Sequence, residues 1–113
     1  HVGIEVYMAA RVNKDEFEGK VLKSDIPVLV DFYSDSCVPC KKMTPVIGDV
    51  EDDMEGKLAV YKVNINFDTE LAESYDVQSV PTLLLFDKGN EKARQSGAVR
   101  KPQLVEWIEE NLK

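Results

Sequence analysis

The stretch from Ile26 to Tyr33 constrains the fold of this chain more than any other segment. It is mostly apolar and rich in β-branched and aromatic residues, and only Pro27 and Asp31 interrupt it. A run of this length and composition is typical of a strand that is buried on both faces of a sheet. Such a strand is covered by helices on both sides, so the rest of the chain should supply them.

Helical and strand patterns alternate along the rest of the chain. The spacing of apolar residues predicts four helices: one capped by Asn13 with Glu16, one from Val38 to Glu55, one capped by Asp68, and one beginning near Pro102. Pro45 lies inside the second helix and should kink it. Further strands are predicted at Leu58 to Ile65, Thr82 to Phe86 and Glu91 to Gly97, with a turn at 87–90 joining the last two. This order predicts an α/β fold with a mixed sheet.

The length of 113 residues suits one domain, which we place at residues 9–113. We interpret residues 1–8, from His1 to Met8, as an N-terminal extension or a cloning remnant that ends at a start methionine. Apolar residues make up 43% of the chain, but no run approaches the roughly 20 that a membrane helix needs. The first ten residues lack the pattern of a signal peptide, so we expect a cytoplasmic protein that does not associate with membranes.

Acidic residues outnumber basic ones by 21 to 14, which gives a net charge of −7. This charge disfavours binding to the phosphates of nucleic acids and to anionic membranes. It is also the ordinary charge of a solvated surface, so it identifies no partner.

The two cysteines, Cys37 and Cys40, are separated by two residues. A secreted mini-protein held by disulfides would normally have several more. One Cys-x-x-Cys motif supplies half of a four-ligand zinc site, and the only histidine is His1. We therefore expect no metal in a monomer, whereas a site shared between two copies stays open.

The segment from Ser36 to Cys40 lies where the buried strand ends and the second helix begins. A helix N-terminus has free N–H groups and partial positive charge, and both stabilise a thiolate at Cys37. A thiolate is the nucleophile of disulfide exchange, and Cys40 is placed to attack the mixed disulfide that results. Pro39 fits the first helical turn. The motif alone would suit metal binding or structural cysteines equally well, and its position after a buried strand favours redox chemistry.

Asp31 interrupts the predicted central strand. A buried carboxyl group is desolvated, so it tends to keep its proton near neutral pH. Such a group can accept the proton of Cys40 when that thiol attacks. Lys62, on the neighbouring predicted strand, is a candidate partner for Asp31, although it is also compatible with a solvated position at a strand end.

Together these segments resemble thioredoxin in order and spacing. The resemblance runs from about Ala10 to Lys113 and rests on the strand 28–33, the motif Cys37-Val38-Pro39-Cys40-Lys41, Pro45, the segment 80–86 and Gly97-Ala98. It implies a thioredoxin fold, with a mixed sheet of four to five strands flanked by four helices. It also implies a protein-disulfide reductase that carries electrons through its own Cys37–Cys40 disulfide, without another cofactor. A thioredoxin reductase would recharge this protein, its clients would be disulfide-containing proteins, and it would be a monomer.

The resemblance also assigns roles to individual residues. Cys37 matches the attacking thiol, Cys40 the resolving thiol, Asp31 the buried acid and Lys62 its neighbouring lysine. Pro81 matches a cis-proline beside the dithiol, although the frequencies of X-Pro bonds alone would predict a trans bond. The backbone of Val80 would then pair with an extended client segment. The resemblance further places Ser36, Val38, Pro39 and Gly97 on the surface that docks the client. Gly89 matches the glycine of the hairpin turn.

Three residues depart from the common thioredoxin pattern. Most members have Trp-Cys-Gly-Pro-Cys, whereas this chain has Ser36 and Val38 at the tryptophan and glycine positions, and Tyr33 where another tryptophan is usual. These positions shape the docking rim, so they bear on partner choice and on the redox potential. The stretch around Cys-Val-Pro-Cys also resembles thioredoxins of anaerobic amino-acid-fermenting bacteria with glycine-reductase-type systems.

Two other functions remain to be distinguished from a reductase. An oxidant or isomerase would use the same dithiol at a higher potential. A binding module would use the fold as a scaffold without turnover, and would keep its partner after both cysteines are replaced.

Overall fold

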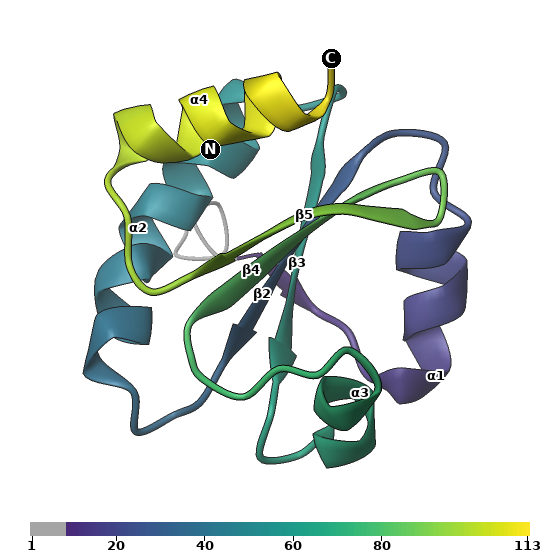
Figure 1. Ribbon diagram of the computed structural model, residues 1–113, viewed down its shortest axis with the longest axis vertical. Helices are drawn as coiled ribbons and strands as arrows, with labels where there is room; N and C mark the ends of the chain where they lie inside the picture. The colour runs from purple at the N-terminus through teal and green to yellow at the C-terminus, as the bar shows by residue number, and fades with distance from the viewer. Residues whose placement is uncertain (1–8) are drawn as a thin grey trace, which may run out of the picture.

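Five strands form one sheet through the centre of the molecule, in the order β1-β3-β2-β4-β5 (Figure 1). The computed structural model describes residues 9–113, so the expected extension at residues 1–8 lies outside the described part. The strands are β1 (Ala10–Arg11), β2 (Val28–Tyr33), β3 (Ala59–Asn64), β4 (Thr82–Asp87) and β5 (Asn90–Ser96).

The strand β2 occupies the middle of the sheet, as its sequence predicts. It runs parallel to β3 and antiparallel to β4. Every residue from Val28 to Phe32 is buried, and Tyr33 is partly exposed. The mixed α/β sheet expected from the order of patterns is therefore confirmed. The edge strand β1 was not predicted, because two residues are too short to produce a pattern.

Helices cover both faces of this sheet (Figure 1). The helices α2 (Val38–Asp53) and α4 (Lys101–Asn111) lie on one face. The other face is covered by α1 (Lys14–Phe17), which continues into the π-helical turn η2 (Glu18–Leu22), and by α3 (Thr69–Ser74). Pro45 lies within α2 without ending it. Each face therefore has its own apolar core.

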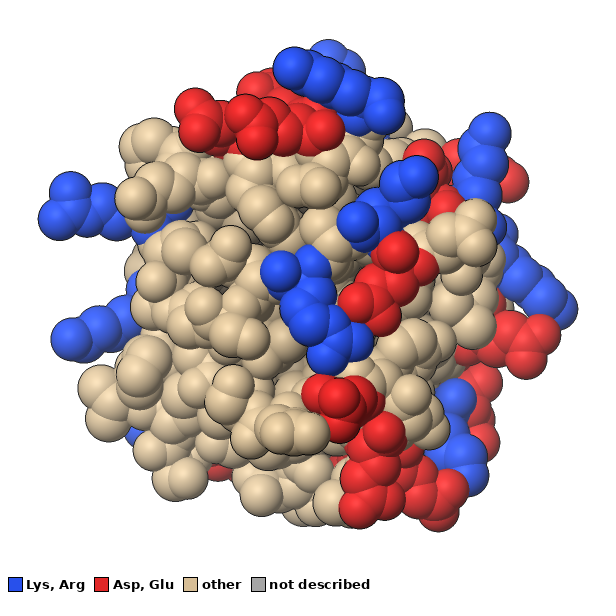
Figure 2. Space-filling model, viewed as in Figure 1, with Lys and Arg blue, Asp and Glu red and all other residues tan. Residues whose placement is uncertain are grey.

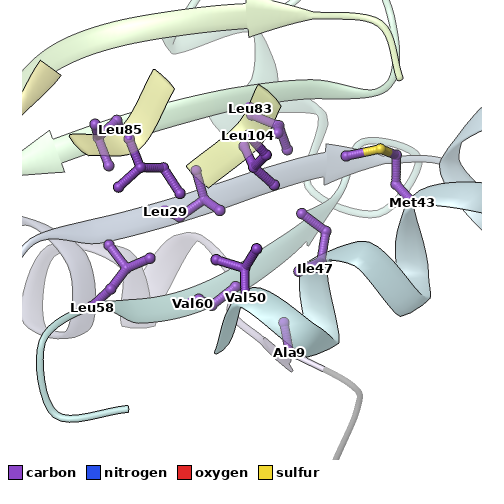
Figure 3. Packing of buried hydrophobic residues seen from close by; sticks show 11 residues of the cluster. Ala9, Leu29, Met43, Ile47, Val50, Leu58, Val60, Leu83, Leu85 and Leu104 are labelled. Atoms are coloured by element: carbon purple, nitrogen blue, oxygen red, sulfur yellow. The ribbon is translucent and has the colours of Figure 1, made fainter. Parts of the chain in front are cut away.

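The two cores contain alternate residues of the same strands, as the period of a β-strand requires. Leu29 of β2 packs toward α2 and α4, in a cluster whose other members include Val60, Leu83 and Leu85 of the sheet (Figure 3). Val28, Val30 and Phe32 of β2 face α1 and α3 instead. Asp31 falls in the series of Leu29, so its side chain points toward the face that α2 covers.

Local sequence signals explain several of the element boundaries. The side chain of Asn13 accepts a hydrogen bond from the N–H of Glu16, and the carboxylate of Glu16 accepts one from the N–H of Asn13. This reciprocal capping box begins α1, as predicted. Lys88 and Gly89 both have positive φ in the turn between β4 and β5, and a Cβ on Gly89 would lie 3.0 Å from the carbonyl oxygen of Leu22. Gly89 is therefore required by the turn and by its close approach to η2.

The predicted position of Asp68 at the start of α3 is confirmed, but the expected side-chain capping bond is absent. Asp68 occupies the N-cap position of α3, but its side chain makes no capping hydrogen bond to that helix. Its Oδ1 accepts a bond from the N–H of Lys14 in α1 at 3.4 Å. The carboxylate therefore links α3 to α1, which a local sequence pattern cannot reveal.

Replacement of Phe86 by alanine tests the core between the sheet and α1. The ring of Phe86 is buried and meets the rings of Phe17 and Tyr75 edge-on, at centroid distances of 5.8 and 5.5 Å. We expect Phe86→Ala to lower the free energy of unfolding by about 3–5 kcal/mol. Phe67 is 66% exposed, so Phe67→Ala is a matched control that should lower it by less than about 1 kcal/mol. Urea denaturation followed by circular dichroism measures both, and equal effects would contradict this description of the core.

Candidate active site

Cys37 is the N-cap residue of α2, at the end of the connection that leaves β2. Its backbone is extended, and its Sγ accepts a hydrogen bond from the N–H of Cys40 at 3.1 Å. A side chain at this position satisfies one of the free N–H groups that begin every helix. The sulfur therefore lies where the helix dipole and a backbone donor both favour negative charge.

Cys40 lies in the first turn of α2 and is buried, whereas Cys37 is partly exposed. The two sulfurs form a disulfide, with the Cα atoms 5.2 Å apart. Pro39 lies between them in the first helical turn, where its missing N–H leaves no helical hydrogen bond unmade. The pair is thus one accessible sulfur and one protected sulfur, joined at the open end of a helix.

A pocket of about 130 Å³ lies beside Cys40, between the end of β2 and the start of α2. It is lined by Asp31, Tyr33, Ser34, Asp35, Cys40, Lys41, Thr44 and Lys62. The structure therefore brings Asp31 and Lys62 together with Cys40, as the sequence predicts. Ser34, Asp35 and Thr44 also line the pocket, and no sequence pattern pointed to them.

Asp31 is 7% exposed, and its Oδ1 is buried without a hydrogen-bond partner. Burial raises the pKa of this carboxyl group from 3.8 to about 7, and the positive charge of Lys62 opposes the rise. The group therefore exchanges its proton near neutral pH. That is the property a proton acceptor for a buried thiol needs.

Lys62 is the register partner of Asp31 on the parallel strand β3. Within residues 9–113, however, no ion pair joins the two side chains. The Lys62 Nζ lies over the ring of Tyr33, 5.5 Å from its centroid. Lys62 therefore acts on Asp31 through its field, and the aromatic ring holds its ammonium group.

The Val80–Pro81 peptide bond is cis, as the resemblance implies. Pro81 leads into β4, whose first residue, Thr82, is opposite Phe32 near the end of β2. The N–H of Gly97 donates to the carbonyl of Pro81 at 2.8 Å, and Gly97 has a positive φ of 89°. The segments around Val80 and Gly97 are thus fixed to each other at the end of the sheet where β2 leads to the dithiol.

The surface around this edge carries few charges. Ser36, Val38 and Pro39 are exposed, and Val38 is 59% exposed. In Figure 2 the lower left of the molecule, over the start of α2 and the loop before β4, is mostly uncharged, whereas acidic side chains gather at the lower right. The exposed residues next to Cys37 are therefore uncharged, whereas the charges of Asp35 and Lys41 lie at the pocket beside it.

No three histidine, cysteine or acidic side chains within residues 9–113 gather where they could hold a metal ion. No helix in the same range is both long and apolar enough to cross a membrane. Trp107 packs against the core between the sheet and α4 and does not line the pocket.

An exposed sulfur at a helix N-terminus, joined to a buried one beside a carboxyl group that titrates near pH 7, defines a thiol–disulfide oxidoreductase. The profile of the thioredoxin family matches residues 8–110. The thioredoxins of Rickettsia bellii and Pseudomonas aeruginosa are each 43% identical to this chain, over 93% and 89% of it and over 100% and 94% of their own lengths. Thioredoxin 1 of a Nostoc species is 39% identical over 92% of this chain and 97% of its own. The chain belongs to the thioredoxin family, and its activity is dithiol–disulfide exchange.

Replacement of Asp31 by asparagine tests the state of the buried carboxyl group. Between about pH 4 and 7 the unfolded chain loses this proton while the folded chain keeps it, so stability falls as pH rises. The shift from 3.8 to about 7 corresponds to about 4 kcal/mol. We expect the oxidised Asp31→Asn variant to be more stable than the unmodified protein by about 2–4 kcal/mol at pH 8.5, and similar to it within about 1 kcal/mol at pH 4.

Urea denaturation at both pH values measures this difference. Asp35→Asn, on the exposed side of the same pocket, is the matched control: it keeps Asp31, so the fall in stability with rising pH should remain. A constant difference between the Asp31→Asn variant and the unmodified protein at the two pH values would show that Asp31 titrates normally.

Proposed function

We propose that this protein reduces the disulfides of client proteins in the cytoplasm and that a thioredoxin reductase returns it to the dithiol form. The observation that carries the proposal is the position of the Cys37 sulfur, which caps α2 and accepts the N–H of Cys40. In the reduced protein the same position favours a thiolate at Cys37 over a thiol. The chain has only these two cysteines and lacks the several structural disulfides of a small secreted protein, which supports a cytoplasmic location.

In the first step the Cys37 thiolate attacks one sulfur of the client disulfide. A mixed disulfide forms between Cys37 and the client, and the other client sulfur leaves as a thiolate that takes a proton from solvent. Cys37 suits this role because it is the more exposed sulfur of the pair. Cys40, which is buried, is protected from attack by external disulfides.

In the second step Cys40 displaces the client. Its thiol proton passes to the Asp31 carboxylate, which lines the same pocket, and the resulting thiolate attacks the Cys37 sulfur. The Cys37–Cys40 disulfide forms, and the second client sulfur leaves as a thiolate that takes a proton from solvent, while Asp31 returns its proton to solvent. Lys62 supports the step, because its positive charge lowers the pKa of Asp31 and so keeps a larger fraction of the carboxylate ready to accept the proton.

The client is held by the backbone around the cis-proline. Val80 offers its N–H and carbonyl to an extended segment, and Pro81 and Gly97 fix the conformation of that edge. The exposed side chains of Ser36, Val38 and Pro39 complete the contact surface. Ser36 replaces the bulkier tryptophan of the common pattern, and Val38 replaces the smaller glycine. Client choice should therefore differ from that of other thioredoxins at these two positions.

The protein works as a monomer and uses its own disulfide as the only redox group, with no metal. The net charge of −7 supports the view that nucleic acids and anionic membranes are not partners. The protein gives two electrons to each client that it reduces, so it needs a reductase that returns two electrons to its disulfide.

Reduction of insulin disulfides tests the proposed activity. Catalytic amounts of the protein should accelerate insulin precipitation well above the rate with dithiothreitol alone, and a bacterial thioredoxin reductase should replace dithiothreitol as the electron source. Cys37→Ser should abolish the acceleration, because the nucleophile is lost. Equal activity in this variant, or no rate above the dithiothreitol blank, would contradict the assignment of Cys37.

Cys40→Ser is the matched variant of the second cysteine. It should attack a client and then stall as a mixed disulfide on Cys37, because the resolving thiol is missing. Non-reducing electrophoresis and mass spectrometry identify the trapped protein. A partner that stays bound after reductant is added, or that still binds when both cysteines are serine, would indicate a scaffold function instead.

A further inference from the structure

The buried side chain of Asn64, at the end of β3, has no part in the reaction described above. It is 1% exposed, and all of its polar atoms are engaged. Its Nδ2 donates to both carboxylate oxygens of Asp35 at 3.3 Å, and its Oδ1 accepts the N–H of Asn66 at 2.9 Å. A buried amide with every group satisfied fixes the segments it joins.

These bonds hold the connection that carries Cys37. The carbonyl of Tyr33 accepts the N–H of Ile65 at 2.9 Å, and the N–H of Cys37 donates to the carbonyl of Ser34 at 3.3 Å. The end of β2 and the connection that follows it are thus attached to the end of β3, through the backbone bond of Tyr33 with Ile65 and the side-chain bonds of Asp35 with Asn64. Asp35 contributes the only negative charge in that connection, residues 34–37.

The carboxylate of Asp35 could instead bind the free N–H groups at the N-terminus of α2. Asp35 precedes the N-cap residue Cys37 by two positions, and carboxylates are favoured at helix N-termini, where they accept the free N–H groups. Among the described residues, however, the oxygens of Asp35 accept side-chain hydrogen bonds only from Asn64. The N–H of Cys40 donates to the sulfur of Cys37 instead.

We propose that Asn64 is a positioning residue that holds the Asp35 carboxylate against β3, so that the Cys37 thiolate is the anion at the N-terminus of α2. Without Asn64, Asp35 competes for the same N–H groups and brings a like charge toward the thiolate. Both effects raise the pKa of Cys37 and slow its attack at neutral pH. The proposal rests on the role of Cys37 as the attacking thiolate.

Other charged groups lie near the same sulfurs and must stay constant in any test. Asp31 from β2, Lys62 from β3 and Lys41 from α2 line the pocket beside Cys40 together with Asp35. None of them is hydrogen-bonded to Asn64. Changes at Asn64 therefore remove no hydrogen bond of Asp31, Lys62 or Lys41.

The pH dependence of alkylation by iodoacetamide tests the proposal, in a Cys40→Ser background where Cys37 alone reacts. We expect Asn64→Ala to raise the pKa of Cys37 by about one unit. Asp35→Asn should not raise it, because an asparagine keeps an acceptor for Asn64 and loses the charge. The double variant should also show no rise, because the displaced side chain is then neutral. This non-additivity is the signature of a positioning role.

Asn64→Ser is a second variant for the case in which alanine disturbs the fold. A serine hydroxyl can still accept the N–H of Asn66 but cannot reach Asp35, so the same rise in pKa is expected. Circular dichroism and thermal unfolding verify that each variant is folded. An unchanged pKa in both Asn64 variants would overturn the proposal, as would a rise that persists when Asp35 is asparagine.

The Cys40→Ser protein with Asp35 and Asn64 unchanged separates this proposal from the assignment of Cys37 as the attacking thiolate. A normal cysteine pKa there would overturn the role of Cys37 and the proposal that rests on it. A lowered pKa that is insensitive to Asn64 would overturn the positioning role alone.

Discussion

The hydrogen bond from the Cys40 N–H to the Cys37 sulfur is the interaction on which the site depends. It exists because β2 ends at Tyr33 and α2 begins at Val38, so the connecting residues 34–37 deliver Cys37 to the N-cap position. The burial of β2 fixes one side of this connection, and the apolar contacts of α2 with the sheet fix the other. The reactivity of one sulfur is therefore set by the packing of two elements, and the same packing buries Asp31 beneath it.

Burial gives the two acidic residues near the dithiol different properties. Asp31 lies in the strand itself, and loss of water raises its pKa to about 7. Asp35 lies on the exposed connection and is held by the amide of Asn64. Asp31 thus lies beside the buried Cys40 with a pKa near neutral pH, and Asp35 lies on the exposed side of the same pocket. The two aspartates differ because the fold gives them different solvent exposure.

The central part of the fold and the site followed from the sequence because their signals are local or strongly periodic. The run 28–33, the Cys37–Cys40 spacing and the capping box of Asn13 and Glu16 are of this kind. Three features could not be predicted, because they depend on contacts between distant segments. Asp68 bonds to α1 rather than capping α3, Lys62 lies over Tyr33 rather than in an ion pair, and Asn64 reaches Asp35. The cis bond at Pro81 followed from the resemblance, because the residue type alone favours trans.

The ionisation of Cys37 in the reduced protein tests the central claim most directly. Its pKa can be measured by the ultraviolet absorbance of the thiolate, in the folded Cys40→Ser protein and in a peptide of residues 34–44 with the same substitution. The peptide has the same local sequence without the packed helix. The account predicts a pKa at least about one unit lower in the folded protein. Equal values in the protein and the peptide would contradict it, because the fold would then contribute nothing to the reactivity of the sulfur.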